Sequence, residues 1–252
     1  SDSYAEGLVM SVYVYQSQAA IPLNLYVVHD KKLTQAQVCE LTVLDQDGWN
    51  GFLSLYRDAF GDRDALRGEH FAQQDVSSQD NFEQLQQRLL KSSVMMAYVA
   101  PRGVGPTIWD QTKKKQVQHQ RRFYLLGESL ESMQVWDVRR AIQAVSTVTG
   151  LNNDTKTTLH ATGRMAGVSL YAALFQNGVA ELHLTHLPSS HRDGPYFFNV
   201  SRICDIPQIA LAVTSQAPLF LYDVDDDGFT HTTDSVRHMN WEQPRLTITA
   251  NK

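Results

Sequence analysis

The feature that most constrains the fold of this chain is a regular alternation of apolar, β-branched runs with segments of helical periodicity. Two β-rich runs joined by a short polar turn, Leu8–Gln18 and Ile21–Asp30, predict an opening hairpin. The later runs alternate with helices, which predicts a mostly parallel sheet covered by helices on both faces. We therefore expect an α/β fold with a sheet of about eight strands. The later strands are expected at Cys39–Asp45, Ser92–Pro101, Thr157–Gly163, Glu181–Pro188, Pro218–Asp225 and Arg245–Ala250.

Composition favours a single domain that spans residues 1–252. Hydrophobic residues make up 42% of the chain and charged residues 19%, which is enough apolar material for a buried core. The net charge of -5 argues against nucleic acid as the main partner, and no apolar run approaches the ~20 residues that span a bilayer. The two cysteines, Cys39 and Cys204, belong to no C-x-x-C motif, which argues against a structural zinc site. Because the chain begins at Ser1 and not at Met, it is expected to be a mature protein or a domain cut from a longer one, and we favour part of a longer protein.

Helical periodicity and polar runs fill the intervals between the expected strands. One polar, glutamine-rich stretch, Glu69–Gln87, is expected to be exposed and to lead into a helix that ends near Leu90. The basic run Lys113–Arg122 is expected to be a solvated loop, with a surface for a partner or an acidic sugar as the alternative. The other helices are expected at Gly51–Gly61, Met133–Val145, Pro207–Ser215 and Asp234–Met239.

One segment, Thr158–Phe175, combines a short strand, a glycine turn and a helix of small and apolar residues. This order usually presents a nucleophile at the turn, in the pattern G-x-S-x-G. The corresponding residues run from Gly163 to Gly167, and Met165 occupies the position of the serine. We expect Gly163 to make the sharp turn, Gly167 to allow close helix–strand packing, and Met165 to fill the space with apolar volume.

Three runs, in this order, resemble the α/β-hydrolase superfamily, and in particular its acetyl xylan esterase and dienelactone hydrolase group. The runs are Tyr98–Thr107, Leu125–Val145 and Leu159–Phe175. The first resembles the R-G-x-G loop of that group, the second the helix before the elbow, and the third the nucleophile elbow itself. The resemblance implies an α/β-hydrolase fold in which Asp137 turns inward.

The resemblance also implies a catalytic serine, a histidine base, an orienting acid and backbone donors for an oxyanion. Met165 takes the place of the serine, and no histidine follows the last expected strand. Several aspartates fill the acid position after Pro218–Asp225, whereas Asp45 puts a carboxylate into the oxyanion loop. Because losing the nucleophile and the base costs roughly six orders of magnitude in turnover, we expect no catalytic residue in this chain.

The function we expect is therefore a catalytically degenerate, esterase-like domain that acts as an auxiliary, scaffold or ligand-binding domain. Its partners would be other domains of a longer esterase-like protein and a carbohydrate or small ester ligand. The alternative is an active carboxylic-ester or carbohydrate esterase with a displaced nucleophile or with residues that a partner supplies. Ser129 and Ser169 are the candidates for that nucleophile, although a helix N-cap and a helix-packing role are simpler interpretations. Descent from a carbohydrate esterase would favour a secreted or periplasmic location.

A second group of candidate residues follows the strand expected at Glu181–Pro188. His191, Arg192 and Asp193 lie at the edge where α/β sheets bind ligands, which predicts a polar binding patch. The simpler interpretation is an ordered loop with an Arg–Asp pair. Three histidines of the strands are expected to be satisfied core or surface residues: His160, His183 and His186.

A possible metal site lies in the run Asp223–Asp234, which follows D-x-D-x-D-G with an acidic residue at the twelfth position. This is the pattern of calcium-binding EF-hand loops, although Thr230 stands where an apolar anchor is usual. Closely spaced carboxylates repel one another, and a bound cation would relieve that repulsion. The alternative is a solvated acidic loop. The predicted calcium ligands are Asp223, Asp225, Asp227, the backbone carbonyl of Phe229, and Asp234.

Overall fold

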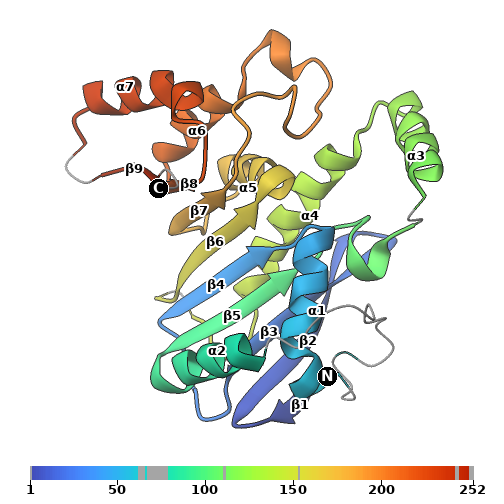
Figure 1. The fold of residues 1–252 in the computed structure, drawn as a ribbon, viewed down its shortest axis with the longest axis vertical. Coiled ribbons are helices and arrows are strands. Elements are labelled where there is room, and N and C mark those ends of the chain that lie inside the picture. The colour runs from blue at the N-terminus through green and yellow to red at the C-terminus, as the bar shows by residue number, and fades with distance from the viewer. Residues whose placement is uncertain are drawn as a thin grey trace.

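A computed structural model describes residues 2–61, 66, 79–109, 112–152, 154–241 and 244–249 (Figure 1). Its strands form one nine-stranded sheet in the order β1-β2-β3-β5-β4-β6-β7-β8-β9. The first three strands form an antiparallel meander, and β3 also runs antiparallel to β5, whereas all the remaining pairs are parallel. The strands are β1 (Asp2–Ala5), β2 (Leu8–Gln18), β3 (Ile21–Asp30), β4 (Val38–Val43), β5 (Val94–Val99), β6 (Lys156–Thr162), β7 (Glu181–Thr185), β8 (Leu219–Tyr222) and β9 (Leu246–Thr249).

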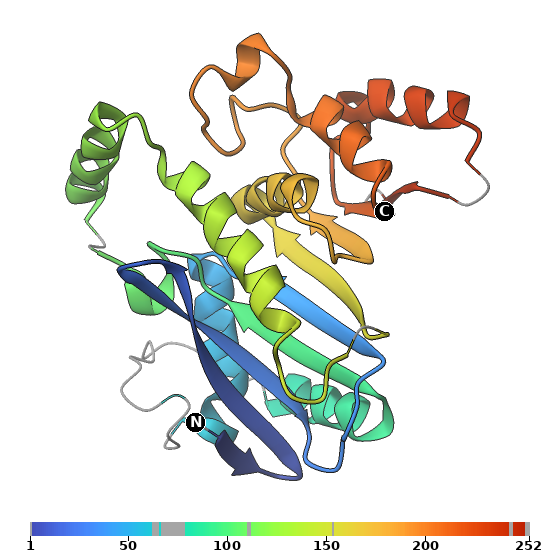
Figure 2. The same cartoon turned by 180° about the vertical axis from the view of Figure 1, so that it is seen from behind.

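Helices cover the two faces of the sheet unequally. On the face turned to the viewer in Figure 1, α1 and α2 lie over β3–β5, and β6 and β7 have no described helix in front of them. The opposite face, seen in Figure 2, is covered by α4 and α5. None of the described helices is both long and apolar enough to cross a membrane. The helices are α1 (Gln46–Phe60), α2 (Gln79–Lys91), α3 (Lys113–Leu125), α4 (Leu130–Val145), α5 (Gly163–Phe175), α6 (Ile206–Thr214) and α7 (Thr230–His238), with short 3-10 turns η1 (Gly105–Thr107), η2 (Val200–Arg202) and η3 (Asp226–Phe229).

An aromatic cluster joins α1 to the sheet in the amino-terminal half of the molecule. Phe52 of α1 lies 5.2 Å from the ring of Tyr26 and 5.0 Å from the ring of Tyr98, centroid to centroid. The hydroxyl groups of Tyr56 and Tyr98 are 3.0 Å apart and share a hydrogen bond. Because aromatic rings bury large areas and attract one another edge to face, this cluster fixes α1 on β3 and β5.

A buried ion pair anchors α4 to the loop after β5 and to the opening hairpin. Asp137 is fully buried and accepts hydrogen bonds from the Arg102 side chain at 2.6 and 2.8 Å and from the Arg102 backbone N–H at 3.0 Å. Arg102 also donates to Gln18 at 2.8 Å, and the hydroxyl of Ser17 donates to Asp137. The expectation that Asp137 turns inward is therefore confirmed, and its charge is compensated by several donors, as a buried carboxylate requires.

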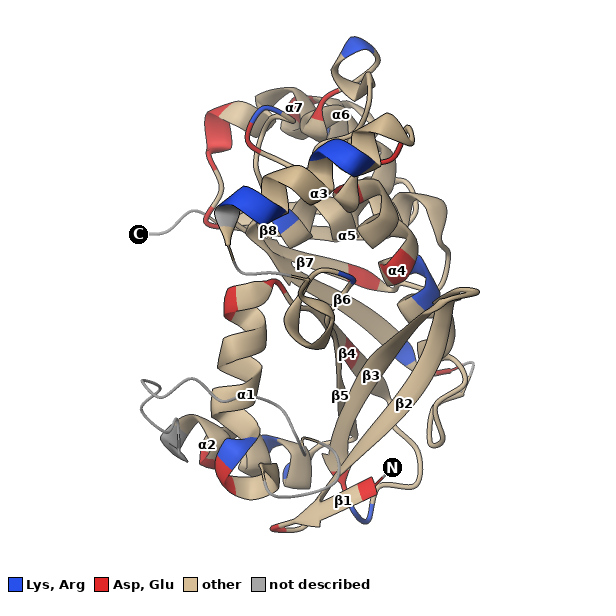
Figure 3. Cartoon of the chain, turned by 90° about the vertical axis from the view of Figure 1, so that its right-hand side faces the viewer, with Lys and Arg blue, Asp and Glu red and all other residues tan. Residues whose placement is uncertain are grey.

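The predicted sheet is confirmed, and the structure differs from the prediction in one additional strand and in one helix. The structure adds a short edge strand, β1, which pairs only with β2. The run Lys113–Arg122, expected as a loop, is helical in α3; this prediction was wrong because most of α3 is exposed and it carries no clear apolar stripe. Figure 3 shows the basic residues of α3 in blue, and Figure 1 shows that this helix stands away from the sheet. Most of the stretch Glu69–Gln87 lies outside the described residues, and α2 begins within it at Gln79.

Candidate functional site

The corner between β6 and α5 is formed by Gly163. This residue has a φ of +57°, in the left-handed region, and the helix begins directly at it. In a nucleophile elbow, the reactive side chain stands on the strained residue at such a strand-to-helix turn. The sequence pattern placed Met165 at this apex, and the structure corrects that position to Gly163, two residues earlier. The apex therefore carries no side chain at all, and a Cβ atom added there would meet nothing within 4 Å.

Met165 and Gly167 both serve packing in the first turns of α5. Met165 is buried in the hydrophobic core, so its thioether does not fill the space at the corner as we had expected. A Cβ atom on Gly167 would lie 2.5 Å from Cδ of Pro195, too close for any side chain. The close packing expected at Gly167 is therefore directed at the loop after β7 and not at a strand.

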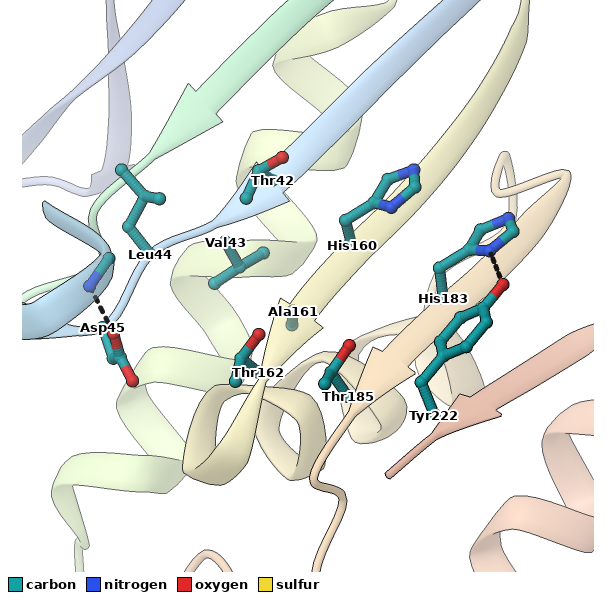
Figure 4. Close-up of a pocket in the computed structure, with 11 residues that line it drawn as sticks. Thr42, Val43, Leu44, Asp45, His160, Ala161, Thr162, His183, Thr185 and Tyr222 are labelled. Atoms are coloured by element: carbon teal, nitrogen blue, oxygen red, sulfur yellow. Dashed lines mark hydrogen bonds between the residues drawn. The ribbon is translucent and has the colours of Figure 1, made fainter. Parts of the chain in front are cut away.

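A pocket of about 320 Å³ opens at the carboxyl ends of β4, β6, β7 and β8 (Figure 4). In the sheet, β4 lies between β5 and β6. The chain goes from β4 to β5 on one side and then crosses over to β6 on the other side, so the strand order reverses at this point. Open α/β sheets bind their ligands at such a point. The pocket is lined by Thr42, Val43, Leu44, Asp45, Gly48, His160, Ala161, Thr162, His183, Thr185 and Tyr222.

Asp45 is the acidic residue in this lining, and it caps α1. One of its carboxylate oxygens accepts a hydrogen bond of 2.7 Å from the backbone N–H of Gly48. The carboxylate thus occupies the amino end of the helix, where free N–H groups would otherwise attract an anion. The loop after β4 therefore contributes a carboxylate to the pocket lining, and its opposition to an oxyanion stays a prediction.

Two histidines stand side by side on the pocket floor. His160 of β6 and His183 of β7 are register partners, and their rings stack at 4.7 Å with an angle of 7° between planes. His183 also stacks on Phe220 of β8 at 4.6 Å and 3°. The Nδ1 atom of His183 hydrogen-bonds the hydroxyl of Tyr222 at 3.0 Å, and His160 Nε2 hydrogen-bonds the hydroxyl of Thr158 at 2.9 Å.

The environment of His160 favours its uncharged form. Burial, and after it the neighbouring His183, lower the pKa of His160 to about 4. The pKa of the Tyr222 hydroxyl is raised by burial and then by Glu181. At neutral pH the pocket floor therefore presents the uncharged ring of His160 and the hydroxyl group of Tyr222, and Asp45 adds a carboxylate to the lining.

Comparison with known proteins identifies the fold. No protein-family model and no curated protein sequence matches this chain. Among solved structures, a protein from Bacteroides fragilis assigned as an acetyl xylan esterase matches 100% of this chain and 68% of its own, with a TM-score of 0.67 and 10% identity. This chain has the α/β-hydrolase fold.

Two further α/β-hydrolase structures superpose on nearly the whole chain. One, from Klebsiella pneumoniae and assigned as a dienelactone hydrolase, covers 98% of this chain and 86% of its own, with a TM-score of 0.56 and 6% identity. The other is a cold-adapted esterase from an Arctic intertidal metagenomic library, which covers 100% and 88%, with a TM-score of 0.56 and 10% identity. The predicted resemblance to the acetyl xylan esterase and dienelactone hydrolase group is confirmed at the level of the fold.

The residues considered for the acid and the base lie after β8. Asp223 follows β8 directly, with a left-handed φ of +54°. His231 and His238 belong to α7, are exposed, and do not line the pocket. The two histidines that do line it were expected to be core or surface residues. Strand alternation puts each on this face, but only the parallel register of β6 and β7 brings the two together.

The predicted patch of His191, Arg192 and Asp193 lies in the loop after β7. His191 is engaged within the protein, because its Nε2 hydrogen-bonds the hydroxyl of Tyr171 at 2.8 Å and its Nδ1 the carbonyl of Pro195 at 2.8 Å. Arg192 and Asp193 are exposed. The histidine thus holds its own loop against α5, and a ligand-binding role for the three residues stays a prediction.

The predicted calcium loop is largely helical. Its residues pass through η3 (Asp226–Phe229) into α7, and Asp234, which lies within α7, is 3.4 Å from Arg237. Across the described ranges, no group of three or more acidic, histidine or cysteine side chains is placed to hold one metal ion. Calcium binding by Asp223, Asp225, Asp227, Phe229 and Asp234 therefore stays a prediction.

Both candidate serines occupy structural positions. Ser129 is the N-cap of α4, in a reciprocal capping box with Ser132, and its hydroxyl donates to the carbonyl of Tyr196 at 2.7 Å. Ser169 is fully buried within α5, and its hydroxyl has no hydrogen-bond partner among the described residues. Neither serine lines the pocket.

Proposed function

We propose that this chain is a catalytically degenerate, esterase-like α/β-hydrolase domain that binds a ligand without hydrolysing it and serves a longer esterase-like protein as an auxiliary domain. The observation that carries the proposal is the glycine at the elbow apex. Gly163 has the left-handed backbone of a nucleophile position, faces open space and has no side chain with which to attack an ester.

The surrounding pocket supports the same interpretation. A carboxylate at the start of α1 opposes the negative charge that develops on an ester carbonyl, where acyl transfer requires hydrogen-bond donors. His160 has a pKa of about 4 and stacks on His183, so it is poorly suited to accept a proton near neutral pH. A pocket of about 320 Å³ nevertheless remains at the ligand-binding edge of the sheet.

The experiment is to treat the protein with a fluorophosphonate probe and, separately, with p-nitrophenyl acetate. We expect no covalent labelling and no hydrolysis beyond that of a heat-denatured sample. Ser129→Ala and Ser169→Ala variants serve as matched controls for the two displaced candidates. Labelling of the unaltered protein that either variant abolishes would overturn the proposal and establish an active esterase.

A further inference from the structure

A row of side chains crosses the sheet at one register level, and all but one of its members are aromatic. From β5 to β8 the row consists of Tyr98, Thr42, His160, His183 and Phe220. The last three rings are nearly parallel, with centroids 4.7 and 4.6 Å apart. These separations equal the spacing of neighbouring strands, about 4.8 Å, so each ring stands directly on its own strand.

Thr42 interrupts this row. Its short side chain lies between His160 and Tyr98, and Tyr98 is turned into the aromatic cluster of α1, where it contacts Phe52 and Tyr56. Thr42 and His160 both line the 320 Å³ pocket, and in Figure 4 the ring of His160 stands between Thr42 and His183. One face of His160 is therefore stacked on His183, while the other faces the space above Thr42.

The short side chain of Thr42 leaves one position of the row without a ring, at the side of the pocket next to His160. A flat group placed there would lie one strand spacing, about 4.8 Å, from His160. Gly48 of α1 lines the same pocket and contributes no side chain to obstruct it. We infer that this space binds a flat aromatic ring, neutral or cationic, which extends the stack of His160 and His183 by one position.

The charge of the pocket lining favours a neutral or cationic ring. The lining contains one carboxylate, that of Asp45, and one of its oxygens accepts a hydrogen bond from the backbone N–H of Gly48. An anion would be repelled by this carboxylate, whereas a cationic or N–H-bearing ring would be attracted to it. The hydroxyl groups of Thr162 and Thr185 offer further hydrogen bonds to the edge of such a ring.

Benzamidine, a flat cation, is the probe, with benzoate as an anion of the same shape and cyclohexanecarboxamidine as a cation without a flat ring. Binding is measured from the proton resonances of the His160 and His183 rings, assigned with single-residue variants. We expect benzamidine to shift the His160 resonance upfield, because a stacked ring shields it. Benzoate and cyclohexanecarboxamidine are each expected to bind about tenfold more weakly.

Two variants, each with a matched control, test where the ring binds. Thr42→Phe fills the space next to His160 with the chain's own ring and is expected to abolish binding, whereas Thr42→Val keeps the space and the affinity. His160→Ala removes the stacking surface and is expected to weaken benzamidine binding about threefold to tenfold, while His29→Ala, outside the pocket, leaves it unchanged. If Thr42→Phe fails to fold, the His160→Ala comparison still decides the question.

This inference rests on the proposed ligand-binding function, and the two can fail separately. Benzamidine that does not bind, or that binds equally well to His160→Ala, would overturn the ring site while an unlabelled protein still supports catalytic degeneracy. Fluorophosphonate labelling of a serine would overturn the proposed function, whatever benzamidine does.

Discussion

One face of the central sheet is built in two different ways along its length. In the half formed by β3 and β5, aromatic side chains are buried under α1, with Tyr26, Phe52 and Tyr56 at most 3% exposed. In the half formed by β6–β8, aromatic side chains of similar size are only half-buried and border a pocket, and the described chain places no helix in front of β6 and β7.

Under the proposed function, the difference separates stability from ligand binding within one sheet. Rings under α1 contribute transfer free energy and packing, because water is excluded from all their sides. The rings of His160 and His183 are instead held by stacking and by hydrogen bonds, and both rings border the pocket. We therefore expect substitutions in the first half to unfold the protein and substitutions in the second half to change its binding.

The largest expected effect contrasts two aspartate–arginine pairs. Asp137→Ala leaves Arg102 charged and buried without its main partner and is expected to cost about 3–5 kcal/mol of unfolding free energy. Asp234→Ala removes an exposed pair with Arg237 and is expected to cost less than about 0.5 kcal/mol. Urea unfolding, followed by circular dichroism in the presence of EDTA, measures both. Similar losses from the two variants would show that the buried network does not anchor the amino-terminal half.

A second contrast uses the same substitution on the two halves of the face. Phe52→Ala removes a ring that is 3% exposed and contacts Tyr26 and Tyr98, with an expected cost of about 3–5 kcal/mol. Phe220→Ala removes a half-buried ring stacked on His183, with an expected cost of about 1 kcal/mol. Urea midpoints of the two variants test this, and equal destabilisation would contradict the division between a packed and an open half.

Much of the fold could be predicted from the sequence because its determinants are local. Apolar runs located all eight of the expected strands. The inward turn of Asp137 was implied by the resemblance to α/β-hydrolases, whereas its ion pair with Arg102 was not predicted. The edge strand β1 was not predicted, because it has only four residues and pairs only with β2. The helix α3 was not predicted, because a helix that is exposed on most sides needs no apolar stripe and so leaves no periodic pattern in the sequence.

The site was less predictable, because it depends on backbone geometry and on register. A G-x-S-x-G pattern can be aligned on glycines, but only the φ angle shows that Gly163, and not Met165, stands at the apex. The pairing of His160 with His183 depends on how two strands align, and those strands are separated by a helix and a loop. No periodicity within one segment reveals that alignment.

The smallest expected effect concerns the pH dependence of stability in the open half. His160 has a folded-state pKa of about 4 against about 6.5 for an unfolded histidine, so the unfolded chain binds a proton first as the pH falls. The stabilising contribution is therefore fully present above pH ~6.5 and is lost between pH ~6.5 and ~4. Because the ring is partly solvated, we expect the loss to be about 1–3 kcal/mol.

His160→Gln removes this titration, so the difference in unfolding free energy between the variant and the unaltered protein should shrink as the pH falls from 7 to 4.5. Thermal and urea unfolding at both pH values measure that difference. The carboxylates that titrate in the same pH range are present in both proteins, so their contribution to the unfolding free energy cancels in the difference. His29→Gln is the matched control for the substitution itself, since His29 lies in β3, away from the open face of β6–β8. A constant difference for His160→Gln would mean that the ring is solvated enough to protonate freely in the folded protein, and a freely charged His160 would no longer offer a neutral stacking surface.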